Sequence, residues 1–321
     1  MKTLYQNMLS KTRAVWFVFL VSLALAACAG APAPTLTPTQ PPPTPAPTPG
    51  APGIPHTRIP FQTFGTWQQD VTYCQNGNVA MKMDVLYPDA ITGTAAPVAV
   101  FLHEMGAEKN EVDIVATGEL LKRGYVVVAP TFWRQSPDFK TPAGIANAKC
   151  AIRHLRANAA IYKIDPNRIG VFGCGGGGYM AALLGVTNAD AGLAGTSGFN
   201  DQSSRVEAVV TRDGLAFTHA GDWTPADLES LFGVSSADDP IIAKTSPLTY
   251  VSKDSPPFLI FQDVSDGTRP GTQELYDKLK AAGAPATLVK ITGSDLCAGG
   301  GNPSQDERAT MTADFFDKNM K

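Results

Sequence analysis

The feature that most constrains the fold is a run of glycines directly after an apolar stretch. Residues 171–180 read Val-Phe-Gly-Cys-Gly-Gly-Gly-Gly-Tyr-Met, which predicts a strand, a tight glycine turn and then a helix. A strand joined so closely to a helix is typical of α/β proteins, in which strands alternate with covering helices. The turn therefore predicts a sheet with helices packed on it.

The rest of the chain beyond residue 60 shows the same alternation. Strands are predicted over Trp67–Gln75, Val79–Tyr87, Val98–His103, Tyr125–Pro130, Arg168–Phe172, Ala208–Arg212, Phe258–Gln262 and Ala286–Ile291. Helices are predicted over Glu111–Arg123, Ala143–Ala160, Gly178–Gly185, Thr272–Ala282 and Gln305–Asn319.

The polarity of these strands predicts their arrangement. The first two alternate in polarity and are joined by Asn76-Gly77, which favours an antiparallel hairpin with one exposed face. The later strands are short and continuously apolar, as expected of parallel strands covered on both sides. We therefore expect an α/β fold with a mostly parallel eight-stranded sheet and helices on both faces. Its functional residues are expected beyond the carboxyl ends of the strands.

Residues 1–27 have the character of a signal peptide. Lys2, Lys11 and Arg13 precede an apolar run that is too short to span a bilayer comfortably. The run ends in Leu-Ala-Ala before Cys28, which resembles the lipobox of bacterial lipoproteins. We expect Cys28 to be lipidated and to hold an exported protein at the cell membrane, in the periplasm or at the cell surface. The alternative is an ordinary signal peptide cleaved at a nearby alanine.

Residues 28–60 are predicted to be a linker. The segment is dominated by Pro, Thr and Ala, which cannot bury a core and which favour an extended polyproline conformation. The folded domain is therefore expected over residues 61–321, a length that fits one α/β domain.

Charge and cysteine content exclude some classes of function. The net charge of -3 and the lack of a basic run argue against nucleic-acid binding. No Cys-x-x-Cys or Cys/His cluster indicates a metal site, and we expect no cofactor. The four cysteines of the mature domain allow three disulfide pairings in an exported protein: Cys74, Cys150, Cys174 and Cys297.

Several short motifs occur in an order that resembles the α/β-hydrolase superfamily. The resemblance is to bacterial acetyl/feruloyl-type esterases and to the related dienelactone-hydrolase-like proteins, and it covers residues 66–320. The motifs are Met83–Pro88, Leu102-His103, Ile152–Asn158, Ile164–Gly170, Ser246–Val251 and Pro256–Ile260.

The resemblance also implies where catalytic residues should lie. The glycine turn corresponds to the G-x-S-x-G nucleophile elbow, whose serine falls on Gly175. The acid of the triad falls on Asp266 and the histidine falls on Leu296. Loss of the nucleophile or the base alone lowers kcat by about 10⁶ in a serine hydrolase. The resemblance thus implies a hydrolase framework in which the ordinary triad mechanism is excluded.

Other residues are candidates for a remaining site. The family's oxyanion loop, usually His-Gly-Gly, reads His103-Glu104-Met105-Gly106, and its histidine usually braces the loop. Cys174 is an alternative nucleophile and His219 an alternative base, whereas His154, on a helix, is expected to have a surface role. The candidates for oxyanion binding or for a pocket are His103, Met105, Gly106, Gly176, Trp133 and Arg212. Arg134, Asp213 and Trp223 also follow strand ends. Such a pocket would suit an acyl-sugar or an aromatic acid; the alternative is simple loop packing.

Cys174 and Cys297 lie next to positions 175 and 296, whose side chains touch each other in active members of the family. This suggests the hypothesis that the two cysteines form a disulfide across the place where the triad serine and histidine would lie. Cys74 and Cys150 would then pair or stay free. The leading prediction is a binding or scaffold module on the cell envelope that does not hydrolyse esters. The alternatives are an active carboxylic ester hydrolase that uses Cys174 or a serine from elsewhere, and a purely structural envelope protein.

Overall fold

The computed structural model describes residues 57–58 and 65–321, except 92, 105–106, 108, 110, 134–139, 188–190, 213–223, 265–269, 294–296 and 298–299. The predicted signal peptide, the lipidation site Cys28 and most of the linker therefore lie outside the described residues. So do the candidate site residues Met105, Gly106, Arg134, Asp213, His219, Trp223, Asp266 and Leu296.

All eight predicted strands are present in one sheet, which is mostly parallel. Within the described residues the sheet has nine strands, in the order β1-β2-β3-β5-β4-β6-β7-β8-β9. β1 and β3 run antiparallel to β2, β3 also runs antiparallel to β5, and the remaining neighbours are parallel. The strands are β1 (Thr57–Arg58), β2 (Thr66–Asn76), β3 (Val79–Tyr87), β4 (Ala96–Leu102), β5 (Val126–Pro130), β6 (Ile164–Cys174), β7 (Ala208–Arg212), β8 (Phe258–Asp263) and β9 (Ala286–Ile291).

The additional strand changes where the folded part begins. Thr57 and Arg58 pair with Thr66 and Trp67 of β2, although sequence composition assigned them to the linker. A two-residue strand in a Pro/Thr-rich segment has too little periodicity to be recognised, and the edge of β2 determines its conformation. The sheet thus starts a few residues before position 61.

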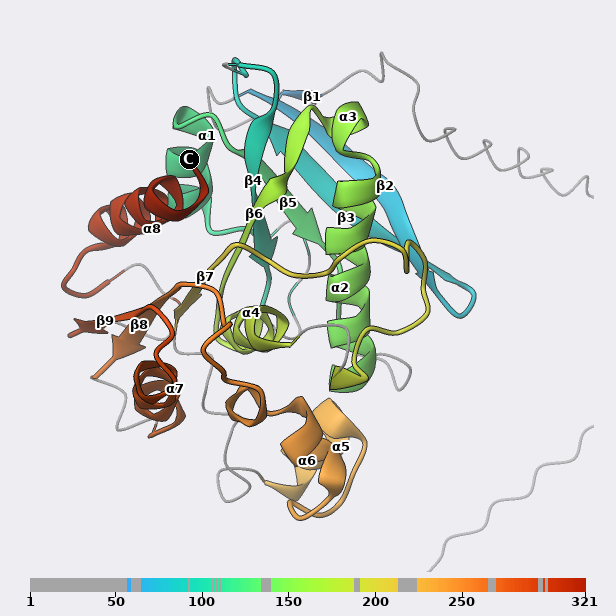
Figure 1. Ribbon diagram of the computed structural model, residues 1–321, viewed down its shortest axis with the longest axis vertical. Helices are drawn as coiled ribbons and strands as arrows, with labels where there is room; N and C mark the ends of the chain where they lie inside the picture. The colour runs from blue at the N-terminus through green and yellow to red at the C-terminus, as the bar shows by residue number, and fades with distance from the viewer. Residues whose placement is uncertain are drawn as a thin grey trace, which may run out of the picture. The chain divides into compact units, whose positions relative to one another are not determined.

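Helices cover both faces of this sheet and make three layers (Figure 1). α1 (Ile114–Lys122) and α8 (Gln305–Met320) pack on one face through Leu120, Leu121 and Phe316. α2 (Thr141–Ala157), α4 (Gly176–Val186) and α7 (Pro270–Ala281) pack on the other face. β4 and β5 lie between the two layers and are buried throughout, which explains their continuously apolar sequences. None of the helices in the described part of the chain combines the length and apolar character that a membrane crossing needs.

Four short helical segments were not anticipated from the sequence. They are α3 (Ala159–Tyr162), α5 (Pro225–Phe232), α6 (Pro240–Thr245) and the 3-10 turn η5 (Pro247–Thr249). α5 and α6 share a small apolar cluster of Leu228, Phe232 and Ile242 that is separate from the two main cores. Each segment is too short for a clear helical period, so tertiary packing rather than local sequence decides its conformation.

The predicted surface role of His154 is wrong. Its side chain is 5% exposed, and Nε2 lies 2.8 Å from the hydroxyl of Tyr162. The ring also packs edge-on against Tyr73 and Phe199. Burial lowers the pKa of His154 to about 4, so the imidazole is neutral at pH 7. His154 is a packing residue of α2 and lies within the core.

Candidate functional site

The glycine turn has the backbone geometry of a nucleophile elbow. β6 ends at Cys174, α4 begins at Gly176, and Gly175 between them has φ 56° and ψ -125°. The Gly175 N–H donates to the carbonyl of Arg212 at 2.9 Å, and the Gly175 carbonyl accepts from the Tyr179 N–H at 2.9 Å. A residue with a side chain is strained in this conformation, whereas glycine adopts it readily.

The flanking glycines allow the strand and the helix to approach closely. A Cβ atom on Gly173 would lie 2.6 Å from the carbonyl carbon of Gly177. One on Gly177 would lie 1.9 Å from the carbonyl oxygen of Leu102, at the end of β4. No side chain fits at either distance, so these two positions keep the small residues that the tight elbow requires. The elbow framework is thus intact around a central residue that has no side chain.

The carboxylate of Glu104 occupies the space above that central residue. Gly176 N–H donates to Glu104 Oε1 at 2.6 Å. A Cβ atom built on Gly175 would lie 1.5 Å from Glu104 Oε2. Sequence reasoning named Glu104 only as part of the loop after β4 and missed this role. Two substitutions relative to the family pattern were the available signal. Glu104 stands where the oxyanion loop usually has glycine, and Gly175 stands where the elbow usually has serine.

A disulfide crosses the same place. Cys174 and Cys297 are bonded, with their Cα atoms 5.6 Å apart, which is the pairing hypothesised from the sequence. Cys297 Sγ lies 3.8 Å from Glu104 Oε2. A sulfur atom in a disulfide has no proton to lose, so Cys174 cannot serve as the alternative nucleophile in this oxidised form. As a nucleophile, Cys174 stays a prediction that applies only to the reduced protein.

The other two cysteines also pair, which resolves an alternative that the sequence left open. Cys74 on β2 is bonded to Cys150 on α2, with their Cα atoms 6.3 Å apart. Both residues are buried in the core between the sheet and α2. This bridge is remote in sequence from the elbow and fastens a helix to the edge of the sheet.

His103 lies at the end of β4, against the first residue of the loop that follows. Its side chain is fully buried, with Nδ1 2.9 Å from the carbonyl oxygen of Glu104 and the ring 4.5 Å from that of Phe132. Both contacts hold the start of the loop that carries Glu104. His103 therefore positions backbone at the end of β4.

The same loop is fixed at its other end by a buried ion pair. Lys109 Nζ lies 2.6 Å from Asp84 Oδ1 on β3 and 3.2 Å from Asp70 Oδ1 on β2. Burial lowers the pKa of Lys109, but the hydrogen bonds and charges of Asp84 and Asp70 outweigh this, so its pKa is raised and it stays protonated.

Two other pocket candidates have different surroundings. Trp133 is 4% exposed and belongs to the core on the α2 side, and its part in a pocket stays a prediction. Arg212, at the end of β7, lies beside Cys174 in the sheet register. It contributes to a small cavity of about 50 Å³, lined also by Phe172, Cys174, Phe261 and Arg308.

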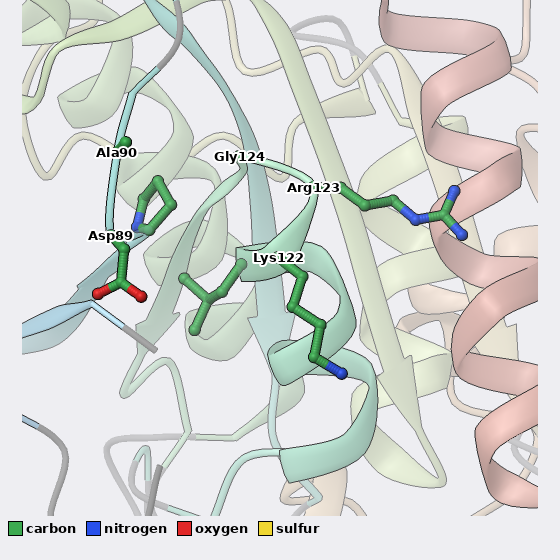
Figure 2. A pocket seen from close by; sticks show the side chains of 7 residues that line it. Asp89, Ala90, Lys122, Arg123 and Gly124 are labelled. Atoms are coloured by element: carbon green, nitrogen blue, oxygen red, sulfur yellow. The ribbon is translucent and has the colours of Figure 1, made fainter. Parts of the chain in front are cut away.

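A larger hollow of about 330 Å³ lies at the opposite edge of the sheet (Figure 2). It is formed by residues 88–90 after β3 and by residues 121–124 between α1 and β5. Figure 2 shows the side chain of Arg123 pointing away from Asp89, toward α8, where it binds Asp314 and Asp317. The hollow contains none of the predicted site residues and is separate from the elbow.

Within the residues that the structure describes, no group of three or more His, Cys, Asp or Glu side chains is arranged to hold a metal ion. Among the described residues, the groups at the elbow include the Glu104 carboxylate, the Cys174–Cys297 disulfide and the backbone N–H of Gly176. Gly175 supplies no nucleophilic atom.

Comparison with known proteins identifies the relatives of this domain. Residues 83–279, more than half of the chain, match the BD-FAE family. Esterase LipQ of Mycobacterium tuberculosis is 27% identical over 234 residues, which cover 70% of this chain and 55% of LipQ. The chain thus spans about half the length of this relative.

Solved structures agree on the fold. A truncated carbohydrate esterase from gut microbiota superimposes with a TM-score of 0.70 at 26% identity, covering 80% of this chain and 97% of that one. A bifunctional GH43-CE protein of Bacteroides eggerthii gives a TM-score of 0.70 at 28% identity, covering 79% of this chain and 35% of that one. These matches confirm the resemblance noted from the sequence motifs. The chain belongs to the BD-FAE family of esterase-like α/β-hydrolases.

Proposed function

We propose that this protein is a binding or scaffold module of the bacterial cell envelope, in which an esterase-like domain no longer hydrolyses esters. The proposal rests on one observation, the Glu104 carboxylate bonded to the Gly176 N–H above Gly175. In this proposal, lipidated Cys28 anchors the exported chain to a membrane, and residues 28–60 hold the domain away from it.

The chemistry of acyl transfer supports this proposal. The reaction needs a nucleophile, a base and free hydrogen-bond donors for the oxyanion that develops. In a G-x-S-x-G elbow the N–H of the residue after the nucleophile is one of those donors. Here that residue is Gly176, and its N–H is already bonded to a carboxylate at 2.6 Å. A carboxylate at this point also repels the negative charge of an oxyanion.

The small cavity beside the elbow suggests a class of ligand. Its lining combines the apolar Phe172 and Phe261 with the charged residues Asp113, Arg212 and Arg308. A volume of about 50 Å³ corresponds to one or two water molecules, so it accommodates a short acyl group better than an aromatic ring. An acyl-sugar bound by its acyl group is therefore favoured over an aromatic acid.

The second candidate is a working carboxylic ester hydrolase whose nucleophile comes from elsewhere in the chain. The names of the relatives favour it, since LipQ is an esterase and the gut-microbiota structure is a carbohydrate esterase. This candidate requires a serine outside the elbow, or a Cys174 thiol released by reduction.

Hydrolysis of p-nitrophenyl acetate together with fluorophosphonate labelling separates the two candidates. We expect the oxidised protein to hydrolyse the ester no faster than the same amount of heat-denatured protein, and to gain no phosphonate adduct by mass spectrometry. A covalent adduct at any serine, with turnover lost when that serine is replaced, would establish the hydrolase instead. A thermal-shift screen of acetylated against unacetylated sugars then tests binding in the same preparation.

A further inference from the structure

The two disulfides differ in their access to solvent. Cys74 and Cys150 are 5% and 0% exposed, inside the core between the sheet and α2. Cys174 and Cys297 are both half-buried, at the carboxyl edge of the sheet. Thiol–disulfide exchange requires a thiolate to reach one of the two sulfur atoms, and exposed disulfides are the labile ones. We therefore expect Cys174–Cys297 to be the more accessible of the two disulfides to a reductant.

The backbone around Cys297 limits what reduction can change. Thr292 and Asn302 form an antiparallel bridge, with N–H to carbonyl distances of 3.0 and 2.8 Å. Cys297 lies between these two anchor points and is tied to the elbow through Cys174. Cleavage of the disulfide thus separates Cys297 from Cys174 while the Thr292–Asn302 bridge remains.

We propose that Cys174–Cys297 is a redox-active site that reacts with dithiols, whereas Cys74–Cys150 is inert in the folded protein. One thiolate of the dithiol attacks one of the two sulfur atoms, the Sγ–Sγ bond breaks, and the other cysteine leaves as a thiolate that takes a proton from water. The second thiol of the reductant, as its thiolate, then attacks the reductant's sulfur atom in this mixed disulfide. The remaining cysteine leaves and is protonated, and the reductant departs as a cyclic disulfide after giving two electrons.

Glu104 lowers the rate of this exchange. Its Oε2 lies 3.8 Å from Cys297 Sγ. A negative charge at that distance disfavours the formation of a thiolate on Cys297. The same charge repels an incoming thiolate at Cys297. Glu104 therefore slows reduction of a disulfide that is otherwise accessible.

Differential alkylation tests the proposal on the folded, oxidised protein. Dithiothreitol is added without denaturant, samples are quenched with iodoacetamide at intervals, and peptides are mapped by mass spectrometry. We expect Cys174 and Cys297 to be alkylated at least tenfold faster than Cys74 and Cys150, while the circular dichroism spectrum stays unchanged. Equal rates for the two pairs, or no reduction of either pair before unfolding, would overturn the proposal.

The Glu104→Gln variant tests the part assigned to the carboxylate. Removal of one charge about 4 Å from the sulfur corresponds to roughly fivefold faster reduction of Cys174–Cys297. The control is Asp254→Asn, which removes an exposed carboxylate ahead of β8 at the opposite edge of the sheet and leaves the rate unchanged. Equal reduction rates for both variants and the unmodified protein would refute the role of Glu104.

The redox proposal and the proposed lack of ester hydrolysis can be refuted separately. Ester turnover that begins only after reduction would contradict the proposed function and leave the redox site standing. A disulfide that resists reduction would contradict the redox site and leave the proposed function standing.

Discussion

At the residue scale, the candidate site is defined by a residue without a side chain at position 175 and a long side chain at position 104. Residue 175 lacks a side chain, and residue 104 supplies one that lies where the missing atoms would be. Glycine at position 175 avoids the backbone strain that a residue with a side chain would have at φ 56°. The Glu104 carboxylate accepts a hydrogen bond from the Gly176 N–H. The glycine at position 175 and the long side chain at position 104 are therefore complementary in size.

The overlap in space predicts that substitutions at Gly175 and Glu104 have strongly coupled effects on the free energy of unfolding. Gly175→Ser should lower the free energy of unfolding by about 3 kcal/mol, because the new Cβ adds backbone strain and overlaps the Glu104 carboxylate. Combined with Glu104→Ala, it should cost about 2 kcal/mol less than the sum of the two single changes. Urea denaturation of the oxidised proteins measures all four free energies. Additive costs would mean that the carboxylate does not occupy this space.

At the element scale, the amino end of α2 caps the carboxyl end of α5. Lys140 Nζ donates to the carbonyls of Glu229 and Ser230, and Thr141 Oγ1 donates to that of Leu231 at 2.8 Å. The Glu229 carbonyl also accepts from the Gly233 N–H at 3.0 Å. The last carbonyls of a helix have no partner within it, so the contacts to Ser230 and Leu231 satisfy groups that α5 leaves open. A short helix with a small apolar cluster of its own thereby gains a fixed position.

Removal of one of these donors should loosen α5 selectively. Thr141→Val keeps the shape of the side chain but deletes a buried hydroxyl, which should cost about 1 kcal/mol. Amide hydrogen exchange over residues 228–234 should become faster, with the sheet unaffected. Thr249→Val is the matched control, because its hydroxyl bonds the Ala243 carbonyl in an exposed position where water can replace it. Equal effects of the two variants would contradict the cap.

At the scale of the whole molecule, Cys74–Cys150 joins two layers that are distant in sequence. It connects β2 near the sheet edge with α2, across 76 positions. Replacement of both cysteines by alanine should lower the free energy of unfolding by about 4 kcal/mol, mainly by increasing the entropy of the unfolded chain. Urea denaturation measures this cost, and a loss below about 1 kcal/mol would show that packing of α2 alone holds the layers. The Cys174→Ala, Cys297→Ala double variant is the comparison, since its 123-residue separation predicts a similar entropic term.

The sequence by itself determined the eight main strands, the antiparallel start of the sheet and the elbow turn, because hydrophobic period and glycine content act over a few neighbouring residues. The Cys174–Cys297 pairing was also within reach, since the family resemblance brought their neighbours together. Only the tertiary structure decided that Glu104 bonds Gly176, that His154 is buried against Tyr162, and that α5 is capped by α2. The contacts of Glu104 and of α5 join residues 72 and 90 positions apart. The burial of His154 depends on side chains from other elements, such as Tyr73 on β2. Such contacts follow from how the layers pack, which no local pattern records.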